Sequence, residues 1–266
     1  MLDMHRTRKL VLIALVMGLL LIQPLDVSAL TASEAKQAWI AAKEASRTAQ
    51  EAHRKANIDW AASKTDANNQ RVIDTGKVVL NAALDEAEAW LTWTDLEVKE
   101  NPEIPEDLKT TIHKDVTTNL AKIDVLRGEV DAVVNRIQLA TVFLKMIGKY
   151  FELVTDVARN TGLVWVHIAD TYADAVDDYE AELRTAAKGA SNENAILAKL
   201  DQARSDLNKA RTNIGLAEAE YLLVKLPGNP ILKFANGNDY LRIARNDLLA
   251  AHSSIKQAYH LLAGTS

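Results

Sequence analysis

The sequence of 266 residues contains no cysteine. This absence excludes disulfide bonds, thiolate metal ligands, a cysteine nucleophile and a lipid-modified N-terminal cysteine. A chain of this length can bury a sizeable core in one domain or two, so its stability must come from that core. Asn-x-Ser/Thr sequons are also absent, and we therefore expect no N-glycans of that type.

Positive charge is in slight deficit, with 31 basic residues against 36 acidic ones and a net charge of −5. Nucleic-acid-binding domains need a basic patch, and anionic lipid surfaces attract basic segments, so the acidity argues against both partners. The sequence also has no nucleophile elbow, phosphate loop, Rossmann fingerprint or zinc-protease helix. We therefore expect no catalytic activity, no catalytic residues and no cofactor.

The first thirty residues form a segment apart from the fold. Residues 5–9 are mostly basic, an apolar run extends from Leu10 to Ile22, Pro24 breaks it, and Val27-Ser28-Ala29 offers small residues for cleavage. This layout is typical of a secretory signal peptide, here residues 1–29, and the run is shorter than the ~20 residues of a membrane-spanning helix. We expect a secreted or extracytoplasmic, envelope-associated protein. The alternative is that residues 1–29 stay uncleaved as an N-terminal anchor, through which alone the protein would contact a membrane.

Proline is scarce, and four of the five prolines form two Pro-x-x-Pro sequences, Pro102-Glu-Ile-Pro105 and Pro227-Gly-Asn-Pro230. Proline ends helices because it lacks the amide donor and clashes with the preceding turn. The rest of the mature chain is dominated by alanine and long charged residues, which are strong helix formers. The sequence therefore predicts an all-α fold in which both Pro-x-x-Pro sequences are turns where helices reverse.

Apolar residues and alanines repeat every seven residues and outline the helices. The sequence predicts helices over about 33–65, 71–99 and from 106 onward, then over about 195–226 and 238–262. The third helix should keep its apolar stripe through Val116, Ile123 and Val130 to Ile137. Asn236-Gly237-Asn238 is expected to be a loop before the last helix. Alanine rows in the first helix and the last two should let neighbouring helices approach closely.

Residues 137–169 are the most apolar stretch of the mature chain. A helix that is apolar on most sides is a buried helix. Asn160-Thr161-Gly162 is the one plausible breaker cluster in this stretch. We expect either one very long helix bent near Gly162 or a reversal near Gln138 to Thr141.

These elements predict an elongated antiparallel bundle of about six long helices in two three-helix units, similar in form to spectrin repeats. The expected units are residues 30–140 and 141–266. A continuous helix at the joint would make a rod, and a reversal there would make a compact bundle. Apolar stripes of the two halves superimpose with a small slip in register, which leaves internal duplication open.

Glycine, aromatic and alanine residues carry a family resemblance. They are Gly162 ahead of Trp165, Gly189 in a turn, Ala210 to Tyr221, and Phe234-x-x-Gly237 leading into Tyr240-Leu241-x-x-Ala244. On these residues the region from about Val72 to Leu262 resembles a loose group of uncharacterised exported all-helical archaeal proteins of unknown function. The resemblance implies a helical fold and export, and it supplies no functional residues.

One cluster has the residue types of a metal site. His167, Asp170 and Asp174 share a helix face, with Asp177 and Asp178 one turn further on. Imidazole and carboxylates at this spacing could hold a divalent metal. Metal sites in bundles, however, draw ligands from several facing helices, and the chain has no Glu-x-x-His pair. We interpret the cluster as a solvated acidic stripe with one histidine and expect no metal.

The other histidines and the tryptophans have structural interpretations. His53, His113, His252 and His260 are expected at the surface. Tryptophans could line a groove for a sugar or an aromatic ligand, but in a long bundle they cover seams between helices. We expect seams, with an exposed patch for a partner as the alternative. The tryptophans are Trp39, Trp60, Trp90, Trp93 and Trp165.

Export, alanine rows and missing catalytic motifs favour a structural or protein-interaction protein of the cell envelope, a helical spacer or adaptor. Its partner would be an envelope protein or a second copy of the chain. The alternative is a helical binding or sensor module that holds a small ligand or metal between helices. That alternative predicts an apolar cavity lined by two or more aromatic residues together with convergent polar groups.

Overall fold

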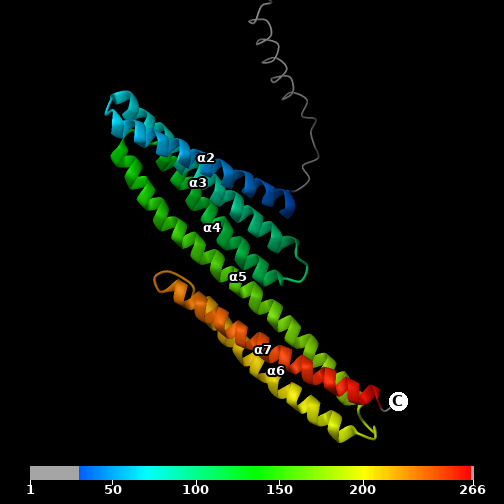
Figure 1. The fold of residues 1–266 in the computed structure, drawn as a ribbon. Coiled ribbons are helices and arrows are strands. Elements are labelled where there is room, and N and C mark those ends of the chain that lie inside the picture. The colour runs from blue at the N-terminus through cyan, green and yellow to red at the C-terminus, as the bar shows by residue number, and fades with distance from the viewer. Residues whose placement is uncertain (1–29, 265–266) are drawn as a thin grey trace, which may run out of the picture.

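A computed structural model describes residues 30–264, which form helices joined by short turns, with no strand in that range (Figure 1). The helices are α2 (Ala32–Ala62), α3 (Asp66–Glu100), α4 (Glu106–Asp131), α5 (Arg136–Ala186), α6 (Glu193–Leu222) and α7 (Pro230–Ala263). The predicted all-α helical bundle is confirmed. The predicted signal peptide, residues 1–29, lies outside the described residues. Within the described part, no helix combines the length and the apolar character needed to cross a membrane.

Polar caps and prolines set the helix ends. The Thr31 hydroxyl accepts a hydrogen bond from the Glu34 backbone N–H (3.3 Å), and the Thr31 backbone N–H donates to the Glu34 carboxylate (2.9 Å). This capping box satisfies amide donors that the start of α2 would otherwise leave free. α3 stops before Asn101, Pro105 precedes α4, and Pro230 is the first residue of α7. Both Pro-x-x-Pro sequences are therefore turns between helices, as predicted.

α5 is a continuous helix of 51 residues that runs past both groups of helices in Figure 1. The chain reverses just before it, because α4 ends at Asp131 and Asn135 caps α5 by accepting a hydrogen bond from the Gln138 N–H (2.9 Å). The reversal expected near residues 138–141 thus occurs a few residues earlier. Ile137 belongs to α5 and is 80% exposed, so its assignment to the stripe of the third helix was wrong.

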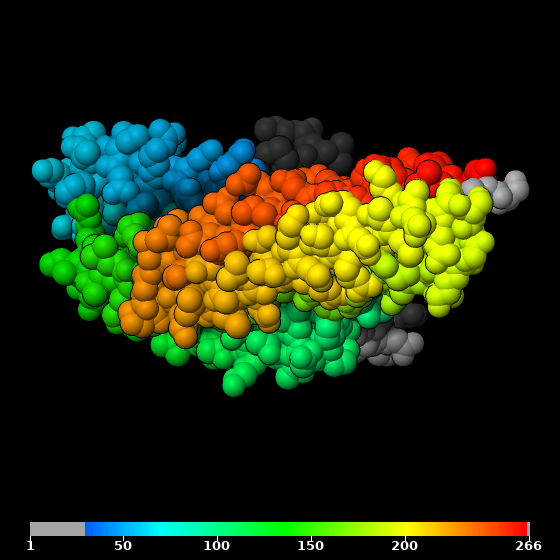
Figure 2. All heavy atoms as spheres, turned by 90° about the horizontal axis from the view of Figure 1, so that it is seen from below, coloured from blue at the N-terminus to red at the C-terminus, as the bar shows by residue number. Residues whose placement is uncertain are grey.

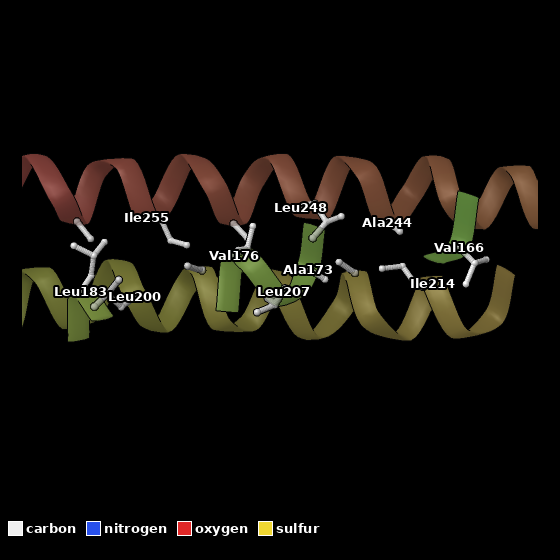
Figure 3. Packing of buried hydrophobic residues seen from close by; sticks show 14 of the residues in the cluster. Val166, Ala173, Val176, Leu183, Leu200, Leu207, Ile214, Ala244, Leu248 and Ile255 are labelled. Atoms are coloured by element: carbon white, nitrogen blue, oxygen red, sulfur yellow. The ribbon is translucent and has the colours of Figure 1, made fainter. Parts of the chain in front are cut away.

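Two hydrophobic cores lie along α5. Its second half packs with α6 and α7, and Figure 3 shows side chains such as Val176, Leu207 and Leu248 filling the space between the three helices. Its first half packs with α3 and α4, while α2 packs along α3. The expected boundary between residues 140 and 141 therefore falls inside α5, which contributes to both cores. Figure 2 shows α6 and α7 (yellow to red) side by side, with the start of α5 (green) extending past them.

The alanine rows act differently at the two ends of the chain. Ala210 of α6 and Ala251 of α7 are fully buried, and their small side chains let these helices approach closely. In α2, Ala49 and Ala56 belong to one row of alanines spaced seven residues apart and are buried, whereas Ala45 belongs to a second such row and is exposed. α2 therefore uses a single alanine row, because its main neighbour is α3.

Tyr221 of α6 joins the second core to both neighbouring helices. Its side chain is fully buried, and a Cβ atom added at Gly162 of α5 or at Gly237 of α7 would lie 2.2 Å or 2.6 Å from its ring. Its hydroxyl donates a hydrogen bond to Asn238 Oδ1 (2.6 Å). The predicted loop at 236–238 is therefore wrong, since these residues lie within α7, from which Gly237 and Asn238 contact Tyr221.

Burial of the Tyr221 hydroxyl should make stability depend on alkaline pH. Burial raises the pKa of Tyr221 to about 12, whereas an unfolded tyrosine titrates near ~10. Between these values the unfolded state loses the phenol proton and the folded state keeps it, so stability falls with rising pH, by roughly 2 kcal/mol at about pH 12. Urea unfolding above about pH 9 should show a steeper loss for the wild type than for Tyr221→Phe. An equal loss of stability with pH in the wild type and in Tyr221→Phe would contradict this prediction.

Candidate functional site

A groove of about 860 Å³ lies between α3 and α5, and α4 contributes to its lining. We call it the α3–α5 groove. Its lining is mostly apolar. The main apolar residues are Leu80, Ala83 and Leu84 of α3, Ile123 and Leu126 of α4, and Phe143, Ile147, Tyr150 and Phe151 of α5.

The groove exists because α5 approaches its neighbours closely at two points and stands away between them. At one point, a Cβ atom added at Gly76 of α3 would lie 2.4 Å from Leu139 of α5. At the other, Arg159 of α5 pairs with Asp115 of α4 (2.6 Å). Between these points, no heavy atom of another described helix lies within 4 Å of a Cβ atom added at Gly148. The Gly148 side of α5 is therefore left open, while Val142 and Leu153 on another side are buried in the first core.

Aromatic and aliphatic side chains of α5 form one wall. Phe143, Ile147 and Phe151 follow each other at four-residue spacing, which places them on one side of a helix. They remain 51%, 52% and 42% exposed. The expectation that residues 137–169 form a helix buried on most sides is wrong for this half of α5, because α3 and α4 cover only its other side.

Polar groups gather at one part of the lining, around Asn119 and Lys122 of α4. The Lys122 ammonium donates to Asn119 Oδ1 and pairs with Glu152 of α5 (both 3.2 Å). Lys149 also pairs with Glu152 (2.8 Å). Hydrogen bonds from Lys149 and then Lys122 hold the pKa of Glu152 below its ordinary value. Two ammonium groups thus share one carboxylate, while Asp115 and Asp156 on the other side of Asn119 share the Arg159 guanidinium.

The second half of the chain reaches this groove through the α6–α7 turn. Leu226, which immediately precedes the second Pro-x-x-Pro sequence, is part of the groove lining. The turn is tied to α5 because the Arg159 guanidinium donates to the Val224 carbonyl (3.5 Å). One of the two turns singled out in the sequence therefore borders the groove, although residues far from it in sequence form the walls.

The residues of the acidic stripe around His167 make separate contacts. His167 Nε2 lies 2.6 Å from the Glu103 carbonyl oxygen, so His167 joins α5 to the α3–α4 turn. Asp174 pairs with Arg211 of α6 (2.8 Å). Burial, and then the charge of Asp174, raises the pKa of Asp170. Among residues 30–264, no group of three or more histidine or acidic side chains is arranged to hold a metal ion.

The remaining histidines differ in exposure. His113, His252 and His260 are exposed, and His113 pairs with Asp95 (2.9 Å). His53 is half-buried, so its predicted surface position is wrong. Its Nδ1 lies 3.0 Å from the Thr75 hydroxyl of α3, which explains its position at the α2–α3 seam. Burial, and then the charge of a nearby arginine, lowers the pKa of His53.

Tryptophans lie mostly at seams between helices. Trp39 of α2 stacks on Trp93 of α3, with ring centroids 5.0 Å apart. The Arg136 guanidinium of α5 covers Trp60 of α2 at 3.7 Å. Trp165 is 43% exposed and lies 6.1 Å from the Phe234 ring of α7. The groove lining, within the described residues, contains no tryptophan, and phenylalanine and tyrosine supply its aromatic rings instead.

Sequence reasoning missed the groove residues although a signal for them was present. Phe143, Ile147 and Phe151 form an apolar row beside the row of Val142 and Leu153, which are buried. Two adjacent apolar rows on one helix exceed what one neighbouring hairpin can cover.

Comparison with protein-family models, with curated proteins and with solved structures finds no match for this chain. The resemblance to exported archaeal proteins therefore stays a prediction.

Proposed function

We propose that this protein is an exported, non-catalytic helical binding protein of the cell envelope, and that the α3–α5 groove holds a small apolar ligand. The observation that carries the proposal is the groove itself. Its volume of about 860 Å³ lies within the range of roughly 300–1,000 Å³ typical of ligand sites. Export and envelope location rest on the leader sequence.

The lining has the features expected of a binding module. Phe143, Tyr150 and Phe151 supply aromatic surface, and Asn119 and Lys122 supply polar groups at one place. The α5 residues that line the groove extend from Phe143 to Leu153, a stretch of about 15 Å of helix. A short groove bounded in this way suits a small molecule better than a long partner helix.

Filling the groove should abolish ligand binding without unfolding the protein. Ala83→Trp adds an indole ring to the lining, so we expect at least about a tenfold loss of affinity for a neutral apolar dye such as Nile red. Fluorescence titration measures this loss, and circular dichroism checks the fold. Ala250→Trp on the exposed side of α7 is the matched control and should bind like the wild type. Equal binding by both variants would refute the proposed function.

A second candidate function, the spacer or adaptor, is supported by the other half of α5. Trp165, Ile168, Tyr172 and Tyr179 lie on one side of the helix and are 43%, 54%, 42% and 46% exposed. Aromatic residues on an exposed helix face are typical of protein interfaces. The partner would be a second copy or another envelope protein. Sedimentation of the purified chain over a range of concentrations tests the first of these, because a monomer throughout would exclude self-association.

A further inference from the structure

We propose that the ligand of the α3–α5 groove is a single-chain amphiphile with an anionic head, a long-chain fatty acid, and that Lys122 and Lys149 bind its carboxylate. This inference rests on the proposed function and adds the class of ligand. It is argued from the shape of the groove, the polarity of its lining and the charge at its rim.

The shape of the groove suits one unbranched hydrocarbon chain. α5 contacts α3 at Gly76–Leu139 and pairs with α4 through Arg159 and Asp115, so the open part is bounded at both ends. An unbranched flexible chain can lie along this apolar lining, which α3, α4 and α5 share.

The polarity of the lining suits a tail without polar groups. The buried Asn119 amide is already satisfied, because its Nδ2 donates to the Asp115 carbonyl (3.0 Å) and to Asp156 (3.0 Å) and its Oδ1 accepts from Lys122. A polar group on the ligand body would meet leucine, isoleucine and phenylalanine side chains and would lose hydrogen bonds to water. The tail should therefore be hydrocarbon.

The charge at the rim suits an anionic head. Lys122 and Lys149 share the single carboxylate of Glu152, at 3.2 Å and 2.8 Å. Each ammonium group has three donors, so the pair retains donors and one positive charge after Glu152 is bound. Lys145 differs, because Glu129 pairs with it (3.0 Å) and it is absent from the groove lining. A ligand carboxylate would accept the hydrogen-bond donors that Glu152 leaves free on the two lysines.

Titration calorimetry of the full purified chain with hexadecanoate and hexadecanol tests this inference. The two probes share a tail and differ in head charge. We expect the wild type to bind hexadecanoate about tenfold more tightly or better, with an advantage that falls as salt is added. The double variant Lys122→Gln/Lys149→Gln should lose that advantage and bind hexadecanol as before. Lys145→Gln is the matched control and should bind both probes like the wild type.

The outcomes separate this inference from the proposed function. If hexadecanoate and hexadecanol bind equally and the double variant changes neither, the anionic head is wrong while the groove remains a binding site. If both probes fail to bind and Ala83→Trp does not alter Nile red binding, the proposed function fails as well. If hexadecanoate binding survives in Ala83→Trp, the fatty acid binds elsewhere and the inference is overturned.

Discussion

Removing both arginines that pair with Glu180 is expected to destabilise the fold by about 3–5 kcal/mol at neutral pH. The Glu180 side chain is only 1% exposed, between α5 and α6. Arg184 pairs with one of its oxygens (2.6 Å), and Arg204 pairs with the other (2.5 Å). In Arg184→Ala/Arg204→Ala, the carboxylate would stay buried without a partner, which is the costly way to break a buried ion pair.

Urea unfolding of the double variant measures this loss. Adding Glu180→Leu to the double variant removes the buried charge and should restore most of the stability. A double variant as stable as the wild type, or one that Glu180→Leu does not rescue, would show that the ion pairs contribute little.

Gly162→Ala is expected to destabilise the second core by about 2–3 kcal/mol, although alanine is the better helix former by up to about 1 kcal/mol. The new Cβ atom would lie 2.2 Å from the Tyr221 ring, closer than atoms can approach. The ring cannot move away easily, because Gly237 of α7 limits it on another side and the Tyr221 hydroxyl is bound to Asn238. Helices α5, α6 and α7 would have to separate.

Gly215→Ala is the matched control for this substitution. Gly215 is an exposed glycine of α6, and no heavy atom from another described helix lies within 4 Å of an added Cβ atom there. This variant should therefore be stabilised by up to about 1 kcal/mol. Combining Gly162→Ala with Tyr221→Leu should cost less than the sum of the two single changes, since the smaller side chain removes the clash. Thermal unfolding that shows additive losses would contradict the contact.

From the sequence, only the type of cavity could be predicted, and its position and lining residues could not. An apolar cavity with two or more aromatic residues was the stated mark of a binding module, whereas the tryptophans were expected at seams and lie mostly there. Phe143 and Phe151 line the groove because α5 stands away from α3 and α4 around Gly148. That separation depends on the Gly76–Leu139 contact and the Arg159–Asp115 pair, whose members are distant in sequence.

The difference between local sequence preference and tertiary contacts also explains the errors in the helix boundaries. Asn236-Gly237-Asn238 has the composition of a loop, yet it is helical, because Gly237 makes room for Tyr221 and Asn238 accepts its hydrogen bond. Gly162 likewise has the composition of a breaker and lies inside α5 for a packing reason. Local propensity is a weak preference of up to about 1 kcal/mol for glycine, and tertiary contacts override it.

The sequence by itself determined that this protein is all-α, that both Pro-x-x-Pro sequences are turns and that heptad rows such as Leu200, Leu207 and Ile214 are buried. These features are local, because helix propensity, proline geometry and seven-residue spacing act within one or two turns of chain. Only the tertiary structure decided that α5 serves both cores and that its first half leaves an apolar groove. Those features depend on which helices meet, and on where side chains such as Leu139 and Tyr221 meet glycine.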